Sequence, residues 1–250
     1  MPVRPDSRNT VVIVPAFNEE ASIGSLIREI RQTVPELPIV VINDGSVDMT
    51  AAVAAQNGAE VLDLPCNVGV GGAVQAGFRY AHDAGYEYVI RCDGDGQHAP
   101  ESIPGLIEAM RSNEVDMVIG SRFLIDGWRG KNVVRHCGIY VLAGMLSVIC
   151  RKRITDPTSG FQMLNRPLMY CFSRSYPVDY PEPEALALMR REGYDFTEVP
   201  ASFRDRKAGR STIRGWGTLY YVFKVFLALL VDRARHVDQR FSKSNLRDKT

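Results

Sequence analysis

The chain has 250 residues, of which 45% are hydrophobic, and its formal net charge at pH 7 is +1. This length and composition suit one large domain, or one domain with an appendage, with enough apolar residues for a core. Such a small net charge gives no general field that would attract nucleic acid, so we expect no nucleic-acid partner. The five cysteines form no CxxC pair, which predicts reduced thiols in the cytosol.

The N-terminal residues differ in character from the rest of the chain. Residues 1–9 are polar, include two prolines and contain no apolar signal region. We therefore expect a disordered N-terminus and no secretion. No uncharged apolar run in the chain reaches the roughly 20 residues that span a bilayer.

Strands and helices alternate regularly through the first half of the chain. Short apolar runs predict strands at residues 11–14, 39–42, 61–64, 88–90 and 116–119. Apolar spacing and helix-start signals predict helices at about 19–34, 51–57, 69–84 and 100–110. This alternation is typical of βαβ units. It predicts an α/β fold with a mostly parallel, Rossmann-like sheet and helices on both faces.

Polar side chains gather where the predicted strands end. They are Asn18, Glu19, Asp44, Asn67, Asp93, Asp95 and Arg122. In an open α/β sheet this edge borders the crevice where ligands bind, so we expect a ligand site there. Asp93, Asp95 and Gln97 occupy alternate positions of one glycine-rich turn and can converge on a hard cation such as Mg²⁺ or Mn²⁺. We expect the neighbouring His98 to be a surface residue rather than a ligand.

Several common site motifs are missing. The first strand is not followed by GxGxxG, and the glycine cluster at residues 69–74 lacks the third glycine at the required spacing. The chain also contains no GxxxxGK[ST] loop, no GxSxG elbow and no HExxH helix motif. These absences argue against a dinucleotide-dependent oxidoreductase, a P-loop NTPase, a serine hydrolase of the elbow type and a zinc protease.

An ordered series of short motifs resembles those of family 2 glycosyltransferases. The motifs are Val14-Pro15-Ala16-Phe17-Asn18-Glu19-Glu20, Asn43-Asp44-Gly45-Ser46, Asn67-Val68-Gly69, Asp93-Gly94-Asp95-Gly96-Gln97-His98, Gly120-Ser121-Arg122, Asp156-Pro157-Thr158-Ser159-Gly160-Phe161 and Glu198-Val199-Pro200. They are most similar to the branch of dolichyl-phosphate mannose synthases and bacterial polyprenyl-phosphate sugar synthases. The resemblance implies a GT-A catalytic domain over residues 10–212, a nucleotide-sugar donor and a divalent metal. It leaves 213–250 as a C-terminal amphipathic helix and tail.

The resemblance also implies roles for individual residues. Nucleotide-sugar contacts fall on Pro15, Phe17, Asn18, Glu19, Asp44, Asn67, Gly69, Asp93, Gly94, Arg206 and Ser211. Metal contacts fall on Asp93, Asp95 and Gln97, and contacts to the acceptor phosphate fall on Arg122 and Arg135. Two positions depart from the family pattern: Asn43 replaces an acid, and Thr212 stands where the branch often has Lys.

The implied chemistry is an inverting displacement at the anomeric carbon. The metal and arginines would stabilise the charge that develops on the leaving diphosphate. A lipid-phosphate acceptor is already an anion, whereas a sugar hydroxyl needs a general base. Asp156, Glu182 and Glu184 are the candidates for that base, and the last two can equally be first-turn acids of a helix. We expect Asp93, Asp95, Arg122, Asp156 and Glu184 to be the catalytic residues.

Two apolar stretches raise the question of membrane contact. Residues 133–150, flanked by basic residues, fit an interfacial helix or an ordinary buried one, and residues 216–231 fit membrane contact or a homodimer face. We expect transfer from a UDP- or GDP-sugar to a polyprenyl phosphate, dolichyl or undecaprenyl. The enzyme would be peripheral at the cytosolic membrane face, bound directly or through a small membrane partner protein. The alternatives are transfer to a saccharide hydroxyl in cell-surface polysaccharide assembly, and a non-catalytic nucleotide-sugar sensor.

Overall fold

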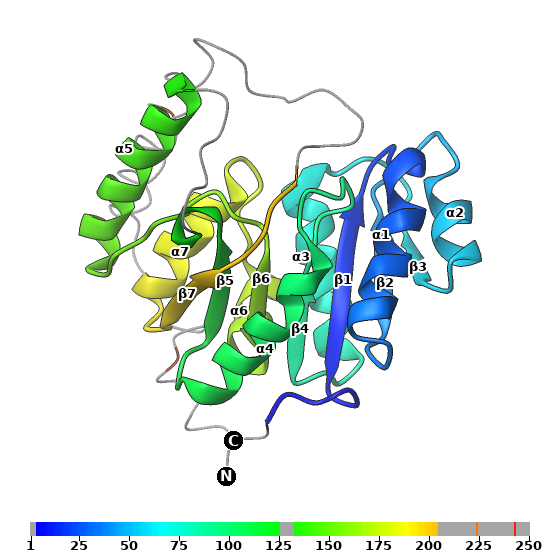
Figure 1. The fold of residues 1–250 in the computed structure, drawn as a ribbon, viewed down its shortest axis with the longest axis horizontal. Helices are drawn as coiled ribbons and strands as arrows, with labels where there is room; N and C mark the ends of the chain where they lie inside the picture. The colour runs from blue at the N-terminus through cyan, green and yellow to red at the C-terminus, as the bar shows by residue number, and fades with distance from the viewer. Residues whose placement is uncertain (1–3, 126–132, 205–223, 225–242, 244–250) are drawn as a thin grey trace.

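The computed structural model describes residues 4–125 and 133–204 together with Lys224 and Lys243, and for 133–137 it describes the backbone alone. Within these residues the chain forms a seven-stranded sheet of order β3-β2-β1-β4-β6-β5-β7 (Figure 1). The strands are β1 Thr10–Ala16, β2 Ile39–Asn43, β3 Glu60–Asp63, β4 Tyr88–Arg91, β5 Met117–Ser121, β6 Gln162–Asn165 and β7 Phe196–Pro200. Every residue of β1, β2 and β5 is buried, as expected for strands with both faces covered.

The helices cover the two faces of the sheet, and each face has its own apolar core. One face carries α1 Glu20–Thr33, α2 Thr50–Gln56 and α4 Ile103–Ser112. The other carries α3 Gly69–Asp83, α5 Val133–Cys150, α6 Arg166–Arg174 and α7 Pro181–Arg191. In α1 the apolar residues three or four positions apart face the sheet, which is why this helix buries one side. The predicted α/β class, with helices on both faces, is confirmed.

The sheet is mostly but not wholly parallel. β1 pairs in parallel with both β2 and β4, and β7 pairs in parallel with β5. β6 runs antiparallel between β4 and β5. The five predicted strands are present, whereas β6 and β7 were not predicted. β6 is only four residues long and has Gln162 and Asn165 at its ends, so its apolar run is too short to signal a strand.

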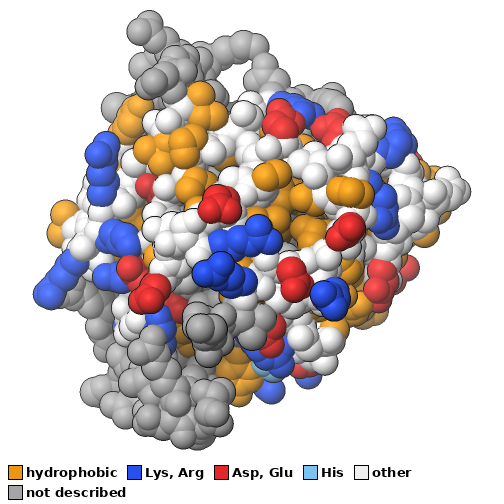
Figure 2. All heavy atoms as spheres, turned by 60° about the horizontal axis from the view of Figure 1, so that its bottom comes forward, with side chains coloured by type: hydrophobic (Ala, Val, Ile, Leu, Met, Phe, Trp, Pro, Cys, Tyr) orange, Lys and Arg blue, Asp and Glu red, His pale blue; other side chains and the backbone are white. Residues whose placement is uncertain are grey.

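Residues 4–9, expected to be disordered, form a turn on the edge opposite the carboxyl ends of the parallel strands. Arg111 of α4 donates from Nε and Nη2 to the carbonyl oxygen of Pro5, at 3.0 and 2.6 Å. A cavity of about 230 Å³ lies between this turn, the end of α1 and α4. On the face that Figure 2 shows, the acidic and basic side chains of the described residues are interspersed.

Helix α5 has one buried side and one exposed side. Leu142 and Leu146 belong to the core that α5 shares with α7. Tyr140, Val141 and Val148 are 60%, 54% and 79% exposed, so the helix presents apolar side chains to its surroundings. Among the described residues, no helix combines the length and hydrophobicity that crossing a membrane requires. Of the stretch 216–231, only Lys224 lies within the described residues.

Candidate active site

The loops that follow β1, β2 and β4 meet at the carboxyl edge of the sheet. Asp44, directly after β2, accepts the backbone N–H of Val68 at 2.7 Å from the loop that follows β3. The N–H of Gly94 donates to the carbonyl of Pro15 at 3.1 Å, and a Cβ at Gly94 would lie only 3.0 Å from that oxygen. Glycine therefore allows the acidic turn to lie directly against the end of β1.

The loop after β1 is fixed by contacts with the loop after β2. Asn18 has a φ of 55°, a left-handed conformation that Asn tolerates better than most residues. Its Oδ1 accepts the N–H of Val47 at 2.9 Å, while its own N–H donates to Ser46 Oγ at 3.0 Å. The N–H of Glu19 donates to Thr50 Oγ1 at 2.8 Å, and Phe17 remains 45% exposed beside them. These contacts hold the loop so that the Phe17 ring is exposed at the carboxyl edge of the sheet.

The loop after β3 completes this side of the site. The N–H of Gly69, the first residue of α3, donates to Asn67 Oδ1 at 3.1 Å. Gly45 has a φ of 66°, and a Cβ there would lie 2.7 Å from the Asn67 nitrogen. The structure thus brings together all the described residues that were expected to contact the nucleotide-sugar. Arg206 and Ser211 lie outside the described residues, as does Thr212.

The acidic turn folds back on itself through its own polar groups. Asp95 is only 8% exposed, and its Oδ1 accepts the N–H of Gln97 at 2.9 Å. Gly96 takes the left-handed conformation that this turn requires, with a φ of 71°. The N–H of Asp93 donates to Nδ1 of His98 at 3.0 Å, while Asp93 Oδ1 accepts from Nε of Arg91 at 2.8 Å.

His98 is buried, which corrects the expectation of a surface residue. It is 4% exposed, stacks on Phe161 with 5.1 Å between ring centroids and meets the edge of Phe203 at 5.1 Å. Burial lowers the pKa of His98, although the carboxylates of Asp93 and nearby Asp95 oppose this shift. Because Nδ1 accepts the Asp93 N–H, the neutral ring carries its proton on Nε2. A single sequence could not reveal the two aromatic rings that cover it.

The acidic turn has the oxygen ligands that Mg²⁺ and Mn²⁺ prefer. Its donor set consists of two carboxylates and one amide oxygen, those of Asp93, Asp95 and Gln97. Within the part of the chain that the structure describes, no group of three His, Cys, Asp or Glu residues could hold a metal ion. Mg²⁺ is commonly bound by one or two carboxylates together with substrate phosphates. The residues present therefore fit a metal shared with a diphosphate.

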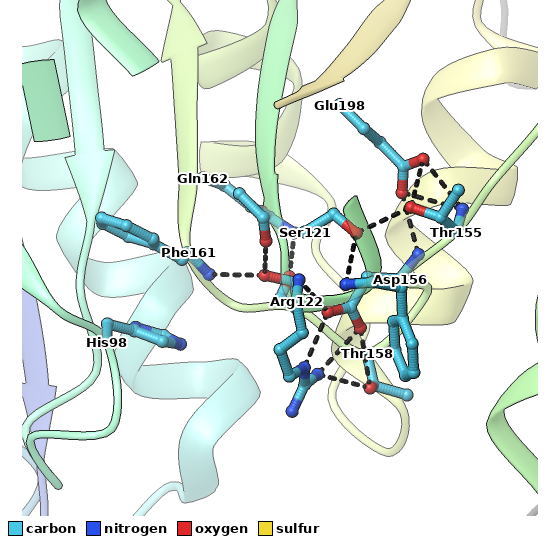
Figure 3. A network of polar contacts seen from close by, with 12 residues as sticks. His98, Ser121, Arg122, Thr155, Asp156, Thr158, Phe161, Gln162 and Glu198 are labelled. Carbon is cyan, nitrogen blue, oxygen red and sulfur yellow. Dashed lines mark hydrogen bonds and ion pairs between the residues drawn. The ribbon is translucent and has the colours of Figure 1, made fainter. Parts of the chain in front are cut away.

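Arg122 lies at the end of β5, and its guanidinium is held by Asp156 (Figure 3). Its Nε and Nη2 donate to the two carboxylate oxygens of Asp156 at 2.7 and 2.8 Å, and Nη2 also reaches Thr158 Oγ1 at 2.9 Å. The guanidinium carbon lies 4.7 Å from the centroid of the Phe203 ring. This two-point pairing fixes the plane of the guanidinium and places a cation near the site.

Glu198 supports this arrangement from β7 (Figure 3). Its carboxylate accepts the backbone N–H groups of Thr155 at 2.8 Å and of Asp156 at 2.9 Å, so it fixes the turn that carries Asp156. Burial raises the pKa of Glu198, while these hydrogen bonds act in the opposite direction. The sequence flagged this residue as part of a motif but assigned it no role.

The other candidate bases lie in the first turn of α7. Glu182 forms an ion pair with Arg91, with 2.8 Å between Oε1 and Nη2. Glu184 lies two residues further along in the same turn, and its N–H donates to the carbonyl of Tyr180 at 3.1 Å. Of the two interpretations of these acids, the placement of both at a helix N-terminus favours the structural one. The side chain of Arg135, an expected acceptor contact, lies outside the described side chains.

Comparison with known proteins agrees with this geometry. Residues 11–172 match the model of the family described as "Glycosyl transferase family 2". An undecaprenyl-phosphate mannosyltransferase of Micrococcus luteus is 31% identical over 227 residues, covering 82% of this chain and 87% of that protein. A polyprenol monophosphomannose synthase of Mycolicibacterium smegmatis is 29% identical over 255 residues, covering 94% and 93%.

Solved structures show the same fold. The glucosyl-3-phosphoglycerate synthase of Mycobacterium tuberculosis, crystallised with Mn²⁺, UDP and glucosyl-3-phosphoglycerate, aligns with a TM-score of 0.64 at 21% identity. The alignment covers 90% of this chain and 79% of that one. The seven-stranded α/β architecture is therefore the GT-A fold, and the chain belongs to glycosyltransferase family 2.

Proposed function

We propose that this enzyme transfers a sugar from a nucleotide diphospho-sugar to a polyprenyl phosphate with the help of a divalent metal. The names of the two bacterial relatives support the polyprenyl acceptor and suggest mannose as the first sugar to test. The proposed catalytic domain spans residues 10–212.

The acceptor is the part of the proposal that the site geometry addresses. A sugar hydroxyl would need a carboxylate free to take its proton, whereas a phosphate acceptor is already an anion. Asp156 engages Arg122 through both of its oxygens, and Glu182 is paired with Arg91. The pairing of Asp156 with Arg122 is the observation that carries the proposal, because it commits the most deeply buried of the candidate bases to an arginine.

The donor would lie along the edge built by the loops after β1, β2 and β3. Phe17 offers an exposed ring for the nucleoside, and Asp44 and Asn67 lie in the adjoining loops. Asp93, Asp95 and Gln97 would hold Mg²⁺ or Mn²⁺, which would supply charge neutralisation on the leaving diphosphate. Arg122 would stabilise donor or acceptor phosphate with a guanidinium already oriented by Asp156.

Peripheral membrane attachment follows from an acceptor that resides in a bilayer. The exposed apolar side of α5 supports it, because Val141 and Val148 project from a helix that the basic segment Arg151-Lys152-Arg153 follows. We place this contact at the cytosolic face of the membrane. Attachment through a small membrane partner protein stays a prediction from the sequence, as does a homodimer.

The test is transfer by the purified protein from a panel of UDP- and GDP-sugars, mannose included, with Mn²⁺ and a short-chain polyprenyl phosphate. The expected product is a polyprenyl-phosphate sugar of inverted anomeric configuration, identified by mass spectrometry and NMR. Transfer to a saccharide but not to the lipid would contradict the proposed acceptor. Donor binding without any transfer would instead favour the nucleotide-sugar sensor.

A further inference from the structure

Arg91 is the largest fully buried side chain of the molecule's described part, and it lies directly beneath the acidic turn. It ends β4, where its backbone pairs with Ile13 of β1 on one side and Gln162 of β6 on the other. Its side chain is 1% exposed. A guanidinium so fully removed from water is stable only where anions and hydrogen-bond acceptors replace its hydration.

Two carboxylates from distant parts of the chain provide that replacement. Nε of Arg91 donates to Asp93 Oδ1 at 2.8 Å, and Nη2 lies 2.8 Å from Glu182 Oε1 of α7. Nη1 donates to the hydroxyl of Tyr176 at 3.3 Å. Burial by itself lowers the pKa of Arg91, but the two carboxylates outweigh it and raise the pKa well above the ordinary value. The guanidinium, which is protonated at any physiological pH, bridges α7 to the acidic turn.

Gly160 provides the space for this bridge. A Cβ at this position would lie 2.7 Å from Asp93 Oδ2 and 2.7 Å from Arg91 Nη2. Such distances are too short for non-bonded atoms, so any larger residue would push the Arg91–Asp93 pair out of place. The glycine of the Asp156–Phe161 motif is thus explained by a contact with β4 rather than by its own backbone conformation.

We propose that Arg91 is a positioning residue that holds the Asp93 carboxylate in the orientation needed to bind the metal–diphosphate group, and that Glu182 holds Arg91 in turn. This inference rests on the proposed function. The hydrogen bond from Arg91 Nε to Asp93 Oδ1 orients the carboxylate that would bind the metal. Without the guanidinium, Asp93, Asp95 and Glu182 would form an uncompensated cluster of negative charge, and Asp93 would turn away from its neighbours.

The first experiment measures Mn²⁺ affinity in the presence of UDP or GDP, by the loss of the free Mn²⁺ EPR signal. Arg91→Lys keeps the charge but cannot reach both carboxylates, so we expect a roughly 10- to 100-fold weaker Mn²⁺ affinity, as for other residues that orient metal ligands. Glu182→Gln keeps an acceptor for Nη2 and should weaken the affinity less. Glu182→Gln also provides the test of the inference if Arg91→Lys fails to fold.

Arg190→Lys is the matched control, because Arg190 is a partly buried arginine of α7 that pairs with Asp195 at the other end of the helix. It should lower thermal stability without changing Mn²⁺ affinity. If Arg91→Lys and Glu182→Gln both fold and both bind Mn²⁺ as tightly as the wild type, the inference about Arg91 is wrong. The proposed metal-dependent function would not be affected by that result. Failure of the wild-type protein to bind Mn²⁺ with either nucleotide would overturn the metal-dependent function as well.

Discussion

Asn43 and Asp63 lie opposite each other at the carboxyl ends of β2 and β3, and Asn43 Nδ2 donates to Asp63 Oδ1 at 2.5 Å. Position 43 is where the family pattern has an acid. Two carboxylates at this distance would repel each other in a site where Asn43 is only 5% exposed. The departure at position 43 is thus compensated by Asp63, and the following residue, Asp44, keeps its contact with the Val68 N–H.

We expect Asn43→Asp to destabilise the fold by about 1–3 kcal/mol, because it replaces a half-buried hydrogen bond with a carboxylate pair. The loss should appear as a lower urea midpoint in equilibrium unfolding. The KM for the nucleotide-sugar donor should rise, because residue 43 directly precedes Asp44, which is expected to contact the nucleotide-sugar. The exchange variant Asn43→Asp/Asp63→Asn restores one amide and one acid and should recover most of the stability. If the single variant were as stable as the wild type, the pair would have no energetic role.

The sequence was sufficient for the parts of the fold that rest on local pattern. Five strands, the helices between them and the polar residues at the strand ends follow from runs of apolar residues and their period. β6 and β7 did not, because Gln162–Asn165 and Phe196–Pro200 lack an apolar run of three or more residues and become strands by pairing with β4 and β5. Their pairing depends on tertiary contacts that a sequence pattern does not encode.

The same limit applies to the site. The motif order located the acidic turn and Arg122, but it could not show that Asp156 and Glu182 are paired with arginines from distant parts of the chain. The sequence did not predict that Arg91 is buried and paired with carboxylates, since an arginine at a strand end normally extends into solvent. His98 was misjudged because Phe161 and Phe203, which cover it, are more than 60 residues away in the chain.

Asp95→Asn should abolish most turnover while leaving the fold intact. The amide oxygen can still accept the Gln97 N–H, so we expect a stability change below about 1 kcal/mol. The lost charge should reduce kcat by roughly 100-fold or more, if this carboxylate binds the metal. EDTA should abolish the transfer activity of the wild-type enzyme, and added Mn²⁺ should restore that activity. Full activity of the variant, or indifference to EDTA, would contradict the metal assignment.

The Arg122–Asp156 pair allows a positioning role to be separated from general-base catalysis. Arg122→Lys loses the two-point contact with Asp156, and we expect kcat to fall roughly 100-fold because an oriented donor to phosphate is lost. Asp156→Asn should lower kcat less, with an unchanged shape of the pH–rate profile. Disappearance of the acidic limb of that profile in Asp156→Asn would instead identify Asp156 as the base and favour a saccharide acceptor.

Membrane contact through α5 can be tested at Val148, which is 79% exposed and should contribute to binding without supporting the fold. Burying a valine side chain is worth about 1.5 kcal/mol or more, so Val148→Asn should weaken binding to anionic vesicles roughly tenfold. Val47→Asn is the matched control, because Val47 is 90% exposed in the loop after β2. Vesicle co-sedimentation measures both. Equal binding by Val148→Asn and the wild type, with circular dichroism showing both folded, would remove α5 from the membrane contact and leave attachment to another surface or to a partner protein.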